Sequence, residues 1–198
     1  MSKFLIFTTF LFLLSCKSEP KAVEETTEQV AKPVEKQEVT EDDLIVRLSG
    51  DLFADPVEQV KKDRNTIVNF AIDNLIDVQG TPTGLYYQIL EPGTGKAIKW
   101  SDRLKAHYQG KFLDGTVFDS SLKRGEPITF YVGNMVMGWN EGLQLIKTGG
   151  KIRLLVPSNL AYGEEGFKMP DGKELIPPNT ILDFEIEVLE HLGTSRDQ

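Results

Sequence analysis

The chain has 198 residues, of which 40% are hydrophobic, and a formal net charge of −8. This length allows one ordinary domain with appendages. The acidic balance, with no run of lysines or arginines, argues against nucleic acid as a partner, and a single cysteine excludes a disulfide framework or a thiolate metal site.

The first residues have the pattern of an export signal. Lys3 precedes an apolar run at residues 4–14, which is too short to cross ~30 Å of hydrocarbon but is typical of a signal peptide. The run ends in Leu-Leu-Ser-Cys, which resembles a bacterial lipobox. We expect a signal peptide over residues 1–15 and a lipid anchor on Cys16 that holds the protein on the cell envelope, outside the cytoplasm. A conventional signal peptide is the alternative.

Residues 16–43 are interpreted as the lipidated cysteine followed by a disordered acidic linker. Residues 17–43 hold four lysines against nine acidic residues, include Pro20 and Pro33, and contain no aromatic residue. Such a segment cannot bury enough apolar surface to offset the entropy of ordering it. Repulsion between its charges is expected to keep it extended. An acidic docking tail is the alternative.

A helical N-terminal extension is predicted over residues 44–80. Asp55 is a suitable N-cap, Pro56 suits the first helical position, and Glu58 follows the cap by three residues. Apolar residues then recur at helical spacing: Val57, Val60, Ile67, Val68, Ala71, Ile72 and Leu75. We expect this stripe to cover the outside of the following domain. A homodimer formed through residues 44–80 is the alternative.

From residue 81 the apolar period becomes that of strands. Strands are predicted at residues 85–90, 103–113, 116–118, 128–132, 151–157 and 180–189, with one short helix at 139–146. The sequence Asp114-Gly115 indicates a tight turn between the second and third strands. The strand at 151–157 alternates, with Leu155 on its polar side. The pattern predicts an α+β domain over residues 81–198, an antiparallel sheet with a helix laid on it.

The sequence offers little for bond-breaking chemistry. Ser120-Ser121 follows an acidic residue, but no strand–turn–helix elbow surrounds it, and His107 falls on the polar side of its strand. His107 and His191 are the only histidines and occupy unrelated positions, so a metal site is not expected. We expect no cofactor. The remaining candidate for a functional site is a set of apolar residues with one carboxylate and two phenols.

Residues ~83–191 resemble the FKBP-type peptidyl-prolyl cis–trans isomerase family. The matching strings, in order, are HYQG at 107–110, DGTVFDSS at 114–121, GWNEG at 138–142, GGKIR at 149–153, PSNLAYG at 157–163 and IPPNT at 176–180. The resemblance implies a twisted antiparallel sheet wrapped on one short helix, preceded here by the N-terminal helix. It also implies catalysis of isomerisation at X–Pro bonds of exported polypeptides.

The resemblance carries a set of site residues onto this chain. The implied catalytic residues are Tyr108, Asp119 and Tyr162, with Tyr162 offering its hydroxyl to a substrate carbonyl and Asp119 bonding Tyr108 and facing Arg124. The implied substrate-binding residues are Phe118, Arg124, Ile128, Met135, Val136, Trp139, Ile176 and Phe184.

Two positions depart from the family pattern. Ile128 stands where the family often has an aromatic residue, and Met135 lies at the pocket rim, where its flexible side chain suits a broad range of peptides. The resemblance implies that proline-containing polypeptides are the substrates. The alternative function is a non-catalytic chaperone or assembly module that keeps the pocket only to bind peptides.

Overall fold

The computed structural model describes residues 39–194, which lie within one compact unit. The predicted signal peptide over residues 1–15, the predicted lipidation site Cys16 and the predicted linker as far as residue 38 lie outside the described residues.

The first described helix, α1, spans Glu41–Leu48 and begins with a capping box. The Thr40 side chain accepts a hydrogen bond from Asp43 N, and the Asp43 side chain accepts one from Thr40 N. The helix therefore starts inside the range 16–43 that was assigned to the linker. The acidic residues that suggest a solvated linker also favour the first turn of a helix, because they face its positive end.

The second long helix, α2, spans Gln59–Asp73 and follows α1 after a 3-10 turn, η1, at Ser49–Asp51 and a loop at residues 52–58. Its N-cap is Glu58, so the predicted start at Asp55 was wrong. The Asn65 side chain explains the difference. It accepts a hydrogen bond from Phe53 N at 2.9 Å and donates one to Phe53 O at 2.8 Å. These bonds hold the chain alongside the helix before it enters the first turn.

The predicted antiparallel sheet is confirmed. Its strands are β1 (Gln79–Gly80), β2 (Tyr86–Glu91), β3 (Asp102–Lys111), β4 (Val117–Ser120), β5 (Ile128–Tyr131), β6 (Lys151–Val156) and β9 (Leu182–Thr194). The order is β1-β2-β6-β9-β3-β4, with β5 also paired to β3, and every pair is antiparallel. A small separate ribbon joins β7 (Phe167–Lys168) to β8 (Glu174–Ile176).

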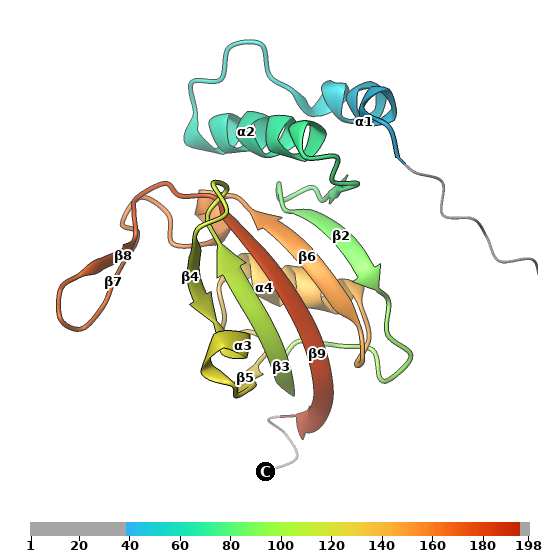
Figure 1. Ribbon diagram of the computed structural model, residues 1–198, viewed down its shortest axis with the longest axis vertical. Helices are drawn as coiled ribbons and strands as arrows, with labels where there is room; N and C mark the ends of the chain where they lie inside the picture. Colours follow the sequence, from blue (N-terminus) through green and yellow to red (C-terminus); the bar gives the residue numbers. More distant parts are fainter. Residues whose placement is uncertain (1–38, 195–198) are drawn as a thin grey trace, which may run out of the picture. The chain divides into compact units, whose positions relative to one another are not determined.

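Short helical segments connect the strands and complete the α+β fold. They are α3 (Ser121–Arg124), α4 (Met137–Gly142), η2 (Leu143–Leu145) and η3 (Ser158–Leu160). The predicted helix at 139–146 thus corresponds to α4 followed by η2. Figure 1 shows α4 behind the sheet and α2 across the end at which β2 begins and β6 ends.

The main hydrophobic core lies between the sheet and α4. Strand β3 alternates as predicted, with Leu104, Ala106 and Tyr108 buried in this core. Strand β9 contributes Leu182, Phe184, Ile186 and Val188. Helix α4 comes close to β6 because glycines face the strand. A Cβ added at Gly142 would lie 2.5 Å from Leu154 Cδ2, so a larger residue there would have to displace the buried Leu154 side chain.

A second core lies under the N-terminal helices. It joins residues of α1 and α2 to residues of the sheet domain: Leu44, Leu48, Ile67, Val68, Ala71, Ile76, Val78, Tyr86, Leu155 and Ile181. Ile67, Val68 and Ala71 of the predicted stripe therefore cover the following domain, as expected, and Ile72 packs against this core. The prediction was wrong for Val57, Val60 and Leu75, which are exposed because they lie at or beyond the ends of the contact. Leu155 was predicted on the polar side of its strand, but it is completely buried, because α1 and α2 cover that end of the polar face.

Candidate functional site

A cavity of about 240 Å³ opens among β3, β4, β9, the loop before α4 and the loop after η3. Its lining residues are Tyr108, Phe118, Asp119, Asn134, Met135, Val136, Trp139, Tyr162 and Phe184. Eight of these are among the eleven site residues predicted from the sequence, and the fold brings them together from segments far apart in the chain. The lining is mostly apolar with a few polar groups, which is typical of a ligand-binding site.

Three predicted residues do not line this cavity. Arg124 does not line the cavity, but it forms an ion pair with Asp119, which does. Ile176 is 1% exposed within the main core, and Ile128 packs against that core. Conversely, the lining residue Asn134 was not predicted, because a polar residue in a short loop carries no periodic signal.

Aromatic rings form the cavity floor in edge-to-face contacts. The Trp139 indole lies 5.1 Å from the Tyr108 ring, at an interplanar angle of 78°, and 5.3 Å from the Phe184 ring, at 90°. Phe118 packs edge-on against Phe184 at 5.7 Å. Such T-shaped pairs are the favoured geometry for rings in contact. The floor is therefore a rigid apolar surface held by residues of three strands and one helix.

Asp119 supplies the carboxylate of the site. It accepts a hydrogen bond from the Tyr108 hydroxyl and forms an ion pair with Arg124. Arg124 Nη2 also donates to the Tyr108 hydroxyl oxygen at 3.1 Å, and its guanidinium lies over the Tyr108 ring at 5.6 Å. Burial and the hydrogen bond to Asp119 raise the pKa of Tyr108. This triad fixes one wall of the cavity and its polarity.

Tyr162 provides the second phenol. Its ring packs against Phe167 of β7 at 5.1 Å. Burial raises the pKa of Tyr162, and the negative charge of Asp119 raises it further. The phenol is therefore neutral across the physiological range and able to donate a hydrogen bond into the cavity.

The rim of the cavity depends on Asn140, a buried residue of α4. Its Oδ1 accepts from Gly133 N at 2.7 Å, and its Nδ2 donates to Met135 O at 2.6 Å. Both bonds pin the loop that carries Asn134, Met135 and Val136. Asn140 lies inside the GWNEG string, but its role was not predicted, since its partners become neighbours only when the loop folds back on the helix.

His107 and Ser121 meet, although a catalytic arrangement was not expected. His107 Nδ1 lies 3.0 Å from Ser121 Oγ. Ser121 is completely buried, and its hydroxyl accepts from Tyr108 N and donates to Tyr108 O, at 2.8 and 3.2 Å. A serine so enclosed cannot reach a substrate. Its role is to hold β3, and hence Tyr108, against α3.

The floor also contains an under-satisfied polar group. Trp139 Nε1 is buried and, within residues 39–194, has no hydrogen-bond partner. An unpaired buried donor costs free energy. Proteins keep such unfavourable groups mainly at functional or strained sites.

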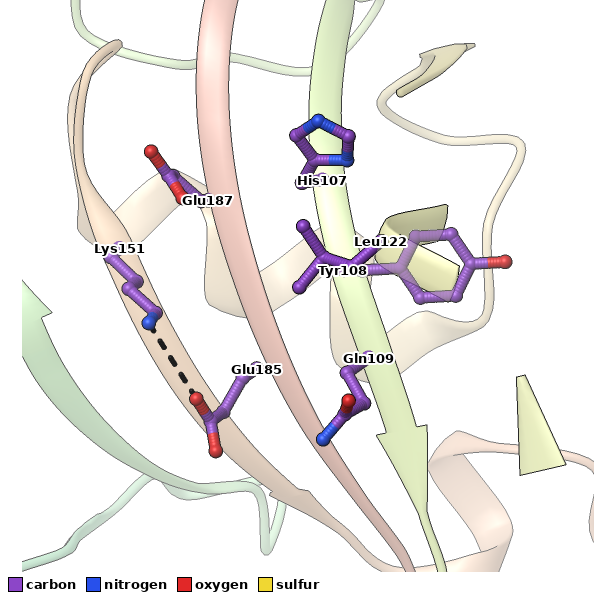
Figure 2. A pocket seen from close by; sticks show the side chains of 7 residues that line it. All are labelled: His107, Tyr108, Gln109, Leu122, Lys151, Glu185 and Glu187. Carbon is purple, nitrogen blue, oxygen red and sulfur yellow. Dashed lines mark ion pairs between the residues drawn. The ribbon is translucent and has the colours of Figure 1, made fainter. Parts of the chain in front are cut away.

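Two further cavities differ in character. Figure 2 shows the first, a hollow of about 70 Å³ on the polar face of the sheet, where Lys151 and Glu185 form an ion pair at 3.6 Å. Glu185 also forms an ion pair at 3.1 Å with Lys111, which does not line the hollow. The second, of about 460 Å³, lies beside Trp100 and Tyr131 and shares Asn134 with the main cavity. The first has carboxylates but only one phenol ring, and the second has two rings but no carboxylate, so neither combines an aromatic floor with a carboxylate as the main cavity does.

Residues 39–194 contain no cluster of three or more histidine, cysteine or acidic side chains arranged to hold a metal ion. Over the same residues, no helix has the length and apolar character needed to span a bilayer.

Comparison with known proteins supports the same interpretation. Residues 95–189 match the sequence profile described as FKBP-type peptidyl-prolyl cis-trans isomerase. A probable FKBP-type peptidyl-prolyl cis-trans isomerase of Haemophilus influenzae is 46% identical over 114 residues, which are 58% of this chain and 45% of that protein. The chain spans about half the length of the curated relatives that it matches.

Solved structures agree. FkpA of Escherichia coli superposes with a TM-score of 0.59 at 37% identity, covering 75% of this chain and 64% of that one. A peptidyl-prolyl cis-trans isomerase of Pseudomonas syringae gives 0.55 at 34% identity, covering 70% of this chain and 98% of that one.

Proposed function

Because the chain belongs to the FKBP-type peptidyl-prolyl cis-trans isomerase family, we propose that it catalyses rotation about X–Pro peptide bonds of polypeptide substrates. The observation that carries the proposal is the ring-floored cavity with a carboxylate and a phenol at its edge.

The reaction calls for no bond cleavage, only easier rotation about a C–N bond. Amide resonance sets a barrier of ~18–20 kcal/mol, and uncatalysed exchange at proline takes tens to hundreds of seconds. A millisecond reaction requires about 10⁴-fold acceleration, or roughly 5.5 kcal/mol. Proton transfer is not needed to supply this, so the lack of an acid–base pair at the cavity is consistent with the reaction.

The cavity lowers the barrier by replacing water. The planar amide is the more dipolar state and gains most from solvation, whereas the twisted amide has its lone pair back on nitrogen. Rings of Trp139, Phe184 and Phe118 therefore penalise the planar form more than the twisted one, which is selective binding of the transition state. Tyr162 donates to the substrate carbonyl, and Asp119 holds Tyr108 in place as the opposite wall.

We further propose that this activity lies outside the cytoplasm, and the signal-peptide pattern at residues 1–15 supports this. In this proposal a lipid on Cys16 would anchor the domain to the cell envelope, where exported chains that are still folding would be its substrates. These chains are the proposed clients. A homodimer through residues 44–80 would use exposed side chains such as Val46 and Val57, because the buried faces of α1 and α2 already contact the sheet.

The test is a refolding assay with a client whose slow phase is limited by X–Pro isomerisation. The full-length chain, at substoichiometric concentration, is expected to accelerate that phase. A folded chain that gives no acceleration would contradict isomerase activity. Binding of the unfolded client without acceleration would instead support the binding-module alternative, which the adaptable Met135 at the rim also suits.

A further inference from the structure

One buried carboxylate joins the N-terminal extension to the loop that carries Tyr162. Asp63 lies on α2, Ser158 is the first residue of η3, and each is 2% exposed. The Ser158 N–H donates to Asp63 Oδ2 at 2.8 Å, and the Ser158 hydroxyl donates to the same oxygen at 2.5 Å. Gln59, one turn earlier on α2, donates to the other oxygen at 2.7 Å.

The contribution of Asp63 is directional. Burying a carboxylate costs free energy unless its oxygens accept hydrogen bonds, and the same helix otherwise buries apolar residues such as Ile67 and Val68. Apolar contacts tolerate small shifts, whereas three convergent hydrogen bonds define both a position and an orientation. Asp63 therefore fixes the backbone of Ser158 relative to α2 more tightly than packing alone.

Ser158 in turn controls the backbone on both sides of Tyr162. Its carbonyl accepts a hydrogen bond from Ala161 N at 3.0 Å and another from Gly163 N at 2.8 Å. Gly163 adopts a left-handed conformation, with φ of 61°, which closes this turn. A displacement of Ser158 would therefore move both neighbours of Tyr162 together.

We propose that Asp63 is a positioning residue that acts through Ser158 to hold Tyr162 at the edge of the substrate cavity. The proposal rests on the proposed isomerase function, because it assigns the placement of Tyr162 to that reaction. It also extends the functional unit beyond the family match at residues 95–189. Helix α2 would then have two roles, since it covers the sheet and also positions the loop that carries Tyr162.

The test compares variants of the full-length chain. Asp63→Ala leaves two buried donors of Ser158 without their acceptor and is expected to lower kcat about five- to tenfold, with KM within about twofold. Asp63→Asn keeps an acceptor oxygen and is expected to recover most of the rate. Asn65→Ala is the matched control. It removes two hydrogen bonds from the same helix, but these go to Phe53, away from the loop.

A double-mutant cycle identifies the route of the effect. If Asp63 acts through Tyr162, then Asp63→Ala should cause no further loss of rate in a Tyr162→Phe background. Equal, multiplying losses in the two backgrounds would overturn the proposal. So would equal rates for the Asp63→Ala and Asn65→Ala proteins at matched folded concentration.

A second readout does not depend on activity. The Tyr162 phenol can be titrated by NMR of its ring carbons in each variant. Displacement of the loop exposes the ring, so Asp63→Ala should lower the pKa of Tyr162 towards the ordinary tyrosine value of about 10, while Asn65→Ala leaves it unchanged. If the wild-type chain proves inactive but this shift occurs, the proposed reaction fails and the positioning role stands. An unchanged pKa in Asp63→Ala would refute the positioning role.

Discussion

At the scale of single residues, the site combines a buried aromatic floor with one ion pair that is partly exposed to solvent. Asp119 and Arg124 are partly exposed, whereas Trp139 is 2% exposed. An ion pair near the surface contributes little to stability. Asp119 therefore matters for the orientation and polarity of the Tyr108 wall more than for holding the fold together.

Replacing Asp119 should separate activity from stability. We expect Asp119→Leu to lower the isomerisation rate about tenfold, since Tyr108 loses its acceptor and Arg124 its counter-charge. The free energy of unfolding should change by about 1 kcal/mol or less. Asp114→Ala is the control, because it removes the same charge from the exposed β3–β4 turn, outside the cavity. A variant with the wild-type rate would remove Asp119 from the mechanism.

Tyr86 should give the fold a measurable alkaline sensitivity. Burial raises the pKa of Tyr86 above its usual value of about 10, and its hydrogen bond to Asp51, at 2.7 Å, raises it further. Above pH 10 the unfolded chain therefore loses this proton before the folded chain does. Stability is unaffected below pH 10 and falls above it, by about 1.4 kcal/mol per pH unit for this one proton.

The corresponding measurement is denaturant unfolding at several values of pH between 8 and about 11. Tyr86→Phe should show a shallower decline than the wild type, because the group that ionises on unfolding is gone. An identical decline in both proteins would show that Tyr86 does not carry the alkaline sensitivity.

Residue-level prediction succeeded where neighbours in the sequence define a motif. Phe118 and Asp119 lie in the DGTVFDSS string, and Trp139 lies in the GWNEG string. All three line the cavity. Asn140 and Asp63 were missed as functional candidates. Their partners, Met135 and Ser158, are assigned by tertiary contacts that no local pattern records.

At the scale of elements, the floor of the site depends on how closely α4 approaches β6. Gly138 and Gly142 face Val156 and Leu154, and a Cβ on either glycine would lie 2.5 Å from one of these side chains. Trp139 lies between the two glycines on α4, so the depth of the indole in the cavity is set by this contact.

Filling one of these positions should therefore cost both stability and rate. Gly142→Ala is expected to destabilise the fold by about 1–3 kcal/mol through overpacking against Leu154, even though alanine favours helix by about 1 kcal/mol. Gly50→Ala is the control, because nothing lies within 4 Å of its added Cβ. Thermal unfolding of both variants measures the difference. Equal stabilities would mean that α4 is free to move away from β6.

Element-level prediction worked for strands and less well for helix ends. Alternation identified β3 and β9 because one face of each enters the main core. Leu155 was assigned to the polar face, because the sequence of β6 does not indicate that helices distant in the chain cover this residue. The start of α2 was misplaced for a similar reason, because the Asn65–Phe53 contact outweighs the local capping signal at Asp55.

At the scale of the whole molecule, the sheet has apolar cores on both faces, and the second depends on α1 and α2. If these helices are integral, core truncations in them should destabilise the entire unit. Leu44→Ala, at a completely buried position, is expected to cost about 2–5 kcal/mol. Val46→Ala, at a position that is 81% exposed, should cost no more than about 0.5 kcal/mol.

Probes in both parts of the unit distinguish integral helices from a loosely attached extension. In a Trp100→Phe background, fluorescence comes from Trp139 alone and reports the main core. Far-ultraviolet circular dichroism is weighted towards the longer helices. We expect both signals to change in a single coincident transition in wild type and Leu44→Ala. Loss of helical signal well before the fluorescence change would mean that α1 and α2 unfold separately from the sheet.

The central claim is that the ring-floored cavity itself accelerates rotation of a bound proline amide. NMR exchange spectroscopy of an X–Pro peptide with a catalytic amount of the full-length chain measures cis–trans exchange, while the protein's spectrum reports where the peptide binds. We predict exchange on the order of milliseconds to seconds at turnover, against tens to hundreds of seconds alone, with perturbed resonances centred on Trp139, Tyr162 and Phe184. Perturbation at these residues without faster exchange, or faster exchange with perturbation elsewhere, would contradict the account.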